Sequence, residues 1–201
     1  MSKVKIKGTT KITGVFGYPI IHSLSPVFQN SAFEYLNLDF VYIPLEVKPK
    51  DLKKAVDAIR IFNWVGINVT IPHKKEVIKF IDELDETSKI LGVVNTIHNV
   101  NGKLKGYTTD GEGFIRSLKE DGKFNPKNKN IFIIGAGGSS YAICGALINE
   151  KINSIFITNR TFENAIKLKE HIVKKLNFKN IKIIEFEKRN EQTIWENIDL
   201  L

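Results

Sequence analysis

A glycine-rich turn between a predicted strand and a predicted helix constrains the fold of this chain more than any other feature. The apolar run Ile131–Ile134 is followed by Gly135-Ala136-Gly137-Gly138-Ser139-Ser140 and then by a helical pattern. Gly135 permits a tight turn, and Gly137 lets backbone N–H groups approach a phosphate without an intervening Cβ. The helix that begins near Gly138 directs its partial positive charge at the same place. These six residues predict a pyrophosphate-binding loop, although Ser140 stands where Gly or Ala is usual.

The residues after the next predicted strand indicate which dinucleotide the loop binds. Ser154 to Thr158 completes a β-α-β pattern and is followed by Asn159-Arg160-Thr161. NAD-binding units commonly carry Asp or Glu here for the ribose 2′-hydroxyl, and a carboxylate repels a 2′-phosphate. A guanidinium instead forms paired charge-assisted bonds with that phosphate. Arg160 therefore favours NADP over NAD, against the alternative of a solvated surface arginine.

The charge of the chain does not by itself indicate a nucleic-acid partner. With 30 basic and 22 acidic residues, the formal net charge is +8. The lysines are spread over nearly every segment, and no nucleic-acid recognition motif accompanies them. We therefore expect small anionic ligands and no nucleic acid. No pattern indicates an oligomeric state.

Cysteine, histidine and hydropathy patterns exclude further classes of protein. Cys144 is the only cysteine and lies in an apolar helical stretch, which predicts a buried side chain and no internal disulfide. His22, His73, His98 and His171 lack ligand spacing, so no metal site is expected. No apolar run approaches the ~20 residues of a membrane span, and Met1 to Lys11 is polar and basic. We expect a cytoplasmic protein without a membrane partner.

The order of predicted elements indicates an α/β protein with two domains. Strands are predicted over Lys11–Phe16, Phe40–Leu45, Gly66–Thr70, Val93–His98 and Lys103–Tyr107, and helices from Ser25, Pro49 and Pro72 and over Gly111–Leu118. Strands and helices then alternate from residue 131 onward. We therefore expect an α/β substrate-binding catalytic domain at residues 1–110. A Rossmann-type dinucleotide-binding domain is expected at residues 111–201, and incomplete at its C-terminus.

Polar residues cluster at the predicted strand ends of the first domain. Ser23 and Ser25 flank one apolar residue at a helix start, where a carboxylate could bind. Ser25, followed by proline, is also predicted to cap that helix. Taken singly, Lys74 reads as a surface lysine, Asp110 as a helix cap and Asn95 as a turn residue. Each residue alone is weak evidence for a site, and the combination of these polar segments in one chain is the stronger evidence.

The ordered set SLSP, NVTIPHK, VVNTI, TTDGEGF, GAGGSS and NRT closely resembles the shikimate dehydrogenase family over residues 12 to 201. The resemblance implies NADPH-dependent reduction of 3-dehydroshikimate to shikimate, a step toward chorismate and the aromatic amino acids. It further implies the site residues. Ser23 and Ser25 would hold the substrate carboxylate. The ring hydroxyls would be bound by Thr70, Lys74, Asn95 and Asp110, with Lys74 and Asp110 as the catalytic pair. The pyrophosphate would be bound by Gly135 to Ser140, and the adenosine ribose and its phosphate by Asn159, Arg160 and Thr161.

The chain departs from the family pattern at three places. Thr109 replaces the Asn that usually precedes the aspartate. Asn164 stands where a second basic residue often follows NRT, and the lack of this basic residue weakens the expected preference for NADP. The chain ends at Leu201 within a predicted strand, before the family's nicotinamide-side loops and C-terminal helix. We therefore expect a truncated chain with low or absent activity.

The sequence is consistent with three alternatives. A quinate/shikimate dehydrogenase paralogue has the same motifs, although a serine pair favours shikimate. A non-catalytic substrate- or nucleotide-binding remnant is consistent with truncation. A basic nucleic-acid binder rests on net charge alone.

Overall fold

The structure, a computed structural model, describes residues 6–201 and divides into two compact units. The first unit extends to Lys89 and includes Val94–Thr108; the second consists of Ile90–Val93 and Thr109–Leu201. Both units combine helices with β-sheets that contain parallel strands, which confirms the α/β class. The functional domain limits at residues 110 and 111 stay a prediction.

The first unit is built on a six-stranded sheet. Its elements are β1 (Lys11–Gly17), α1 (Ser25–Tyr35), β2 (Phe40–Glu46), the 3-10 helix η1 (Pro49–Asp51), α2 (Leu52–Ile61), β3 (Gly66–Val69), the 3-10 helix η2 (Glu76–Phe80), β4 (Glu83–Leu84), β5 (Thr96–Val100) and β6 (Lys103–Tyr107). The helix α3 (Glu86–Leu91) runs from the first unit into the second. An Asn101-Gly102 turn joins β5 to β6 as a hairpin, and both turn residues have the positive φ that such turns require.

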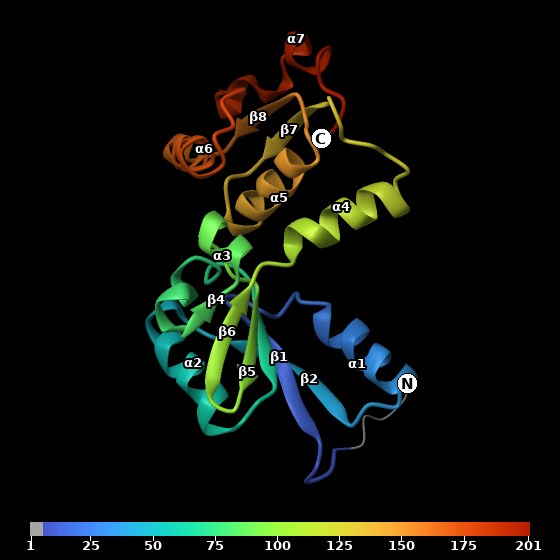
Figure 1. Cartoon of the computed structure of the whole chain (residues 1–201), viewed down its shortest axis with the longest axis vertical. Helices are drawn as coiled ribbons and strands as arrows, with labels where there is room; N and C mark the ends of the chain where they lie inside the picture. Colours follow the sequence, from blue (N-terminus) through green and yellow to red (C-terminus); the bar gives the residue numbers. More distant parts are fainter. Residues whose placement is uncertain (1–5) are drawn as a thin grey trace. The chain divides into compact units, whose positions relative to one another are not determined.

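Helices cover both faces of this sheet, whose strand order is β2-β1-β3-β5-β6-β4. β1 pairs in parallel with β2 and β3, whereas β5 runs antiparallel to β3 and β6. Val15 belongs to a small buried cluster against which Phe33 of α1 packs, and the adjacent Phe16 belongs to a core cluster with Val56 and Ile59 of α2. Because consecutive strand residues face opposite sides, α1 and α2 lie on opposite faces, as Figure 1 shows.

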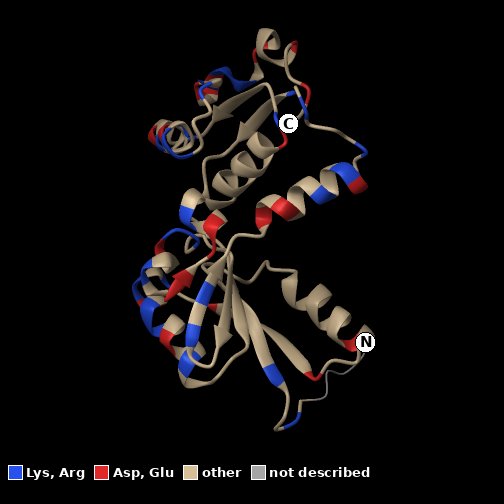
Figure 2. Cartoon of the chain, viewed as in Figure 1, with Lys and Arg blue, Asp and Glu red and all other residues tan. Residues whose placement is uncertain are grey.

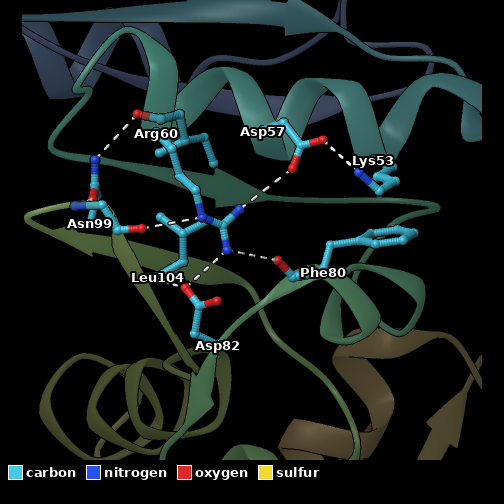
Figure 3. A network of polar contacts seen from close by, with 9 residues as sticks. Lys53, Asp57, Arg60, Phe80, Asp82, Asn99 and Leu104 are labelled. Carbon is cyan, nitrogen blue, oxygen red and sulfur yellow. Dashed lines mark hydrogen bonds and ion pairs between the residues drawn. The ribbon is translucent and has the colours of Figure 1, made fainter.

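Arg60, near the end of α2, ties together three segments of the first unit (Figure 3). Its guanidinium donates to the main-chain oxygens of Phe80 at 3.3 Å and Gly102 at 3.2 Å. It also lies 2.9 Å from Asp82 Oδ2, and Asp82 Oδ2 accepts the Leu104 N–H at 2.6 Å. A single cation therefore binds main-chain carbonyl groups at the end of η2 and in the β5–β6 turn.

The second unit is a parallel β-α-β assembly. Its elements are α4 (Asp110–Glu120), β7 (Asn130–Ile134), α5 (Gly138–Asn149), β8 (Ser154–Thr158), α6 (Phe162–Leu176), β9 (Ile181–Ile183), the 3-10 helix η3 (Phe186–Asn190) and α7 (Gln192–Trp195). The strand order is β7-β8-β9, and all pairs are parallel. Leu200 forms an isolated parallel bridge with Ile131, on the edge of β7 not used by β8.

The helix after the glycine turn is the centre of the second core. Cys144 and Leu147 of α5 are fully buried together with Ile155 and Ile157 of β8 and Leu168 of α6. α5 contains no charged residue, whereas α4 and α6 carry both signs, as Figure 2 shows. This composition fits a helix that contacts both α4 and α6. Burial raises the pKa of the Cys144 thiol to about 12, consistent with an inert core residue.

Within residues 6–201, none of the helices has the length and apolar character needed to cross a membrane.

Candidate functional site

The two serines after β1 are joined by a hydrogen bond. The N–H of Ser25, the first residue of α1, donates to Ser23 Oγ at 3.3 Å. The expectation that Ser25 caps the helix is wrong, because the N-cap is Leu24, which makes no side-chain cap bond. Ser23 instead accepts an N–H group at the helix start, a group that has no partner within the helix. Both serines are half-buried.

Tyr42 of β2 links the serine loop to the centre of the sheet. The side chain is 4% exposed, and its hydroxyl donates to Asn68 Oδ1 at 2.7 Å. Burial is the main cause that raises the pKa of Tyr42 to about 12, and a hydrogen bond with the Ser25 side chain opposes this rise. The hydroxyl therefore stays protonated throughout the physiological pH range.

Asn68 is a polar residue inside a strand, and it joins β3 to the start of β5. Its amide nitrogen donates to Thr96 Oγ1 at 3.1 Å and to the Asn95 carbonyl at 3.4 Å. The Thr96 hydroxyl donates to Asn95 Oδ1 at 3.3 Å. Sequence reasoning missed both Asn68 and Tyr42. The available signal was an Asn between buried Ile67 and Val69, in a strand where Asn is disfavoured.

Asn95 is held by the main chain on two sides. Its carbonyl accepts the Val69 N–H at 2.7 Å, and its N–H donates to the Tyr107 carbonyl at 3.0 Å. Asn95 therefore lies where β3 and β6 end and β5 begins. Thr70 lies at the same edge, because its N–H donates to the Phe16 carbonyl at 2.9 Å.

Lys74 lies in a turn segment between β3 and η2. The expected helix from Pro72 to Ile81 is wrong: residues 71–75 form turns, and only Glu76–Phe80 forms a 3-10 helix. The Lys74 carbonyl accepts the Val94 N–H at 2.8 Å instead of a helical i+4 group. His73 is buried, with Nε2 2.7 Å from the Val47 carbonyl. These long-range bonds fix the backbone that carries Lys74.

The structure thus brings Ser25, Thr70, Asn95 and the Lys74 backbone to one edge of the first sheet. Asp110 belongs to the second unit, where it is half-buried and opens α4 directly after the N-cap Thr109. A carboxylate in the first turn interacts favourably with the helix dipole.

The predicted pyrophosphate loop has an open backbone. Gly135 has φ +121°, and its N–H donates to the Thr158 carbonyl at 2.8 Å. No atom lies within 4 Å of where a Cβ would stand on Gly135 or Gly137. Gly137 is the N-cap of the 12-residue helix α5 and makes no side-chain cap bond. The Ser140 hydroxyl closes the loop by donating to the Gly135 carbonyl at 2.9 Å.

Asn159 connects this loop to the start of α6. Its Oδ1 accepts the Ala136 N–H at 3.1 Å, and its Nδ2 donates to the Thr161 carbonyl at 2.8 Å. Arg160 and Thr161 are exposed, and Thr161 is the N-cap of α6. The start of α5 has no side-chain cap, and no atom lies near the Cβ positions of Gly135 and Gly137, so the loop has room for a pyrophosphate. The exposed Arg160 guanidinium fits a dinucleotide that carries an additional phosphate.

Among residues 6–201, no group of three or more His, Cys, Asp and Glu side chains could hold a metal ion.

Comparison with known proteins finds two family profiles that match this chain. The profile of the shikimate dehydrogenase substrate binding domain matches residues 15–97, and that of shikimate / quinate 5-dehydrogenase matches residues 118–194. The shikimate dehydrogenase (NADP(+)) of Desulforamulus reducens is 46% identical over 173 residues, covering 86% of this chain. That of Methanosphaera stadtmanae is 42% identical over 196 residues, covering 98%.

A solved shikimate dehydrogenase in complex with NADP+ superposes with a TM-score of 0.86 and 38% identity, over 98% of this chain and 67% of that one. The chain spans 60% of the length of the D. reducens relative and 68% of the M. stadtmanae relative.

Proposed function

The chain belongs to the shikimate dehydrogenase family, and from this membership we propose that it reduces 3-dehydroshikimate to shikimate with NADPH. The observation that carries the proposal is the gathering of polar groups at one edge of the first sheet. Ser25 follows β1, Thr70 follows β3, and Asn95 precedes β5. Tyr42 and Asn68 connect the first of these positions to the last.

Ser23 and Ser25 hold the carboxylate of the substrate in this proposal. Two hydroxyl groups at the start of an 11-residue helix suit an anion, because the helix N-terminus adds a partial positive charge. Thr70, Lys74, Asn95 and Asp110 bind the ring hydroxyls. Hydroxyl, amide, ammonium and carboxylate groups together match oxygens that both donate and accept hydrogen bonds.

Lys74 and Asp110 form the catalytic pair. The reduced cofactor supplies a hydride to the carbonyl carbon when it is bound. Lys74 donates a proton to the carbonyl oxygen, and its charge stabilises negative charge that develops there. Asp110 orients the ammonium and accepts a hydrogen bond from a substrate hydroxyl. In the reverse direction, Lys74 takes the proton back from the alcohol.

The loop from Gly135 to Ser140 binds the pyrophosphate of NADP, with Ala136, Gly137, Gly138 and Ser139 between these ends. Asn159, Arg160 and Thr161 bind the adenosine ribose and its phosphate. The Arg160 guanidinium favours NADP over NAD through charge-assisted bonds to the 2′-phosphate. A comparison of kcat/KM with NADPH and with NADH measures this preference.

The partners in this proposal are small molecules, the substrate and NADP, and the reaction requires neither a nucleic acid nor a membrane. We assign the reaction to the cytoplasm, where cells maintain NADPH for biosynthetic reductions.

The deciding experiment compares Lys74→Ala with Lys75→Ala in 3-dehydroshikimate reduction, together with shikimate affinity measured by calorimetry. General acid catalysis contributes roughly 10²–10⁴-fold, so Lys74→Ala is expected to lose at least about 100-fold in kcat while shikimate affinity changes far less. Lys75→Ala removes the same charge one residue away and should retain kcat. Ser23→Ala should mainly raise KM. A wild-type kcat in Lys74→Ala would contradict the catalytic role.

A further inference from the structure

We propose that Asn68 and Thr96 are positioning residues that set the orientation of the Asn95 side-chain amide, so that its NH2 group is the end offered to the substrate. This inference rests on the proposed function, because it assigns Asn95 to substrate binding. Neither Asn68 nor Thr96 needs to touch the substrate. They act through Asn95.

The direction of each hydrogen bond follows from the chemistry of the groups. Asn68 Oδ1 can only accept, so the Tyr42 hydroxyl donates to it across 2.7 Å. Asn68 Nδ2 can only donate, so it supplies a hydrogen to Thr96 Oγ1 at 3.1 Å. The Thr96 hydroxyl then donates its own hydrogen to Asn95 Oδ1 at 3.3 Å. The relay from Tyr42 to Asn95 therefore runs in one direction.

The orientation of Asn95 matters because its amide has two chemically different ends. The Thr96 hydroxyl engages Oδ1, and Nδ2 is the donor end. A hydroxyl oxygen and a carbonyl oxygen both accept a hydrogen bond, so an NH2 group can bind substrate and product alike. A reversed amide would present an oxygen, which can bind only a hydroxyl.

The Thr96 contact acts on the side chain and is not needed to hold the Asn95 backbone. The Asn95 carbonyl and N–H are already bound by Val69 and Tyr107. Asn68 and Thr96 are direct partners in the β3–β5 register, so the relay is built on two strands and not on loops. Their side chains and that of Tyr42 line a cavity of about 290 Å³.

Two substitutions at Thr96 separate the hydroxyl from the shape of the side chain. Thr96→Val keeps the branched shape and removes the donor, whereas Thr96→Ser keeps the donor. Thr13→Val is a matched control, because Thr13 lines the same cavity and donates to the Val41 carbonyl at 3.0 Å outside the relay.

Asn68→Asp tests the direction of the relay. An aspartate at position 68 accepts from the Thr96 hydroxyl, which takes that hydrogen away from Asn95. Asn68→Asp and Thr96→Val should therefore have similar effects on Asn95, and their combination should not be additive.

The readouts are the side-chain amide resonances of Asn95 in ¹⁵N-labelled protein, the affinity for shikimate by calorimetry, and KM and kcat. Thr96→Val should shift the Asn95 amide resonances and weaken shikimate affinity roughly tenfold, the upper end expected from one hydrogen bond. NADP+ affinity should stay unchanged. Thr96→Ser and Thr13→Val should keep both the resonances and the shikimate affinity of the wild type.

Unshifted Asn95 resonances in Thr96→Val, or a Thr96→Ser variant that behaves like Thr96→Val, would overturn the relay. If the wild type fails to bind shikimate, the proposed function fails, and the Asn95 resonances still decide whether Thr96 orients the amide. The two failures are therefore distinguishable.

Discussion

Asp82 Oδ2 lies 2.9 Å from the Arg60 guanidinium and also accepts the Leu104 N–H at 2.6 Å. One carboxylate oxygen thus serves a cation and a main-chain donor, as Figure 3 shows. The Arg60 side chain is only 27% exposed, and it also binds two main-chain carbonyls. The pair is therefore part of a network that joins α2, the segment before β4 and the β5–β6 hairpin.

Arg60→Ala is expected to lower the free energy of unfolding by about 1–3 kcal/mol, because it removes the Arg60 donor from two main-chain carbonyls and the cation from Asp82. Lys53→Ala is the control, since Lys53 forms an exposed i,i+4 pair with Asp57 at 2.7 Å. Such pairs contribute about 0.3–0.5 kcal/mol. Urea denaturation measures both variants. Equal losses in the two variants would count against the network.

The Asp82 carboxylate should make stability depend on pH in the acid range. The hydrogen bond from the Leu104 N–H is the largest single cause that lowers the pKa of Asp82 from 3.8, and the hydrogen bond and charge of Arg60 lower it further. The unfolded chain therefore binds this proton at a higher pH than the folded chain does. The resulting stabilisation is present above the ordinary pKa and is lost as the pH falls through the lowered one.

Wild type should accordingly be more stable than Asp82→Asn at pH 7, and the difference should shrink below about pH 4. Urea denaturation of both proteins between pH 7 and pH 3 tests this. A difference that stays constant across this range would show that the Asp82 charge does not contribute.

The sequence predicted those parts of the fold that depend on residues adjacent in the chain. The positive φ angles at Asn101 and Gly102 follow from the residue types themselves, and the apolar run before Gly135 identified β7. The turn around Lys74 could not be predicted in this way. The Lys74 carbonyl is bound by Val94, 20 positions further along the chain, and this bond replaces a helical one.

The candidate site shows the same division. The serine pair and the glycine loop stand out in the sequence because short motifs carry their chemistry. The Tyr42–Asn68 pair does not, because the partners are 26 residues apart and meet only when β2, β1 and β3 assemble. A polar residue in a strand signals an unusual position but does not identify its partner.

The packing of α4 on α5 requires a glycine at position 111. A Cβ on Gly111 would stand 2.6 Å from the Ala142 carbonyl and 2.9 Å from Ala146 Cβ. Because these are backbone and short side-chain atoms, the helices must separate. Gly111→Ala should therefore cost about 1–3 kcal/mol of stability.

Gly113→Ala provides the matched control in the same helix, since no atom lies within 4 Å of its Cβ position. Alanine is the better helix former, so this variant should be unchanged or more stable by up to about 1 kcal/mol. Thermal or urea unfolding distinguishes the two. A Gly113→Ala variant destabilised as much as Gly111→Ala would show that the loss at position 111 is not specific to the contact with α5.

Gly137→Ala should weaken cofactor binding without weakening the fold. Gly137 has φ −82°, which any residue adopts, and its Cβ position has no neighbour within 4 Å. Stability should therefore change by no more than about 0.5 kcal/mol. The added methyl group would occupy the path by which N–H groups of the loop approach a phosphate, so NADP+ affinity should fall at least about tenfold.

Gly135→Ala should differ from Gly137→Ala, because φ is +121° at Gly135 and the free energy of unfolding should fall by about 1–3 kcal/mol. Calorimetric titration with NADP+, combined with urea unfolding, checks both variants, and unchanged NADP+ affinity in Gly137→Ala would remove this loop from the binding site.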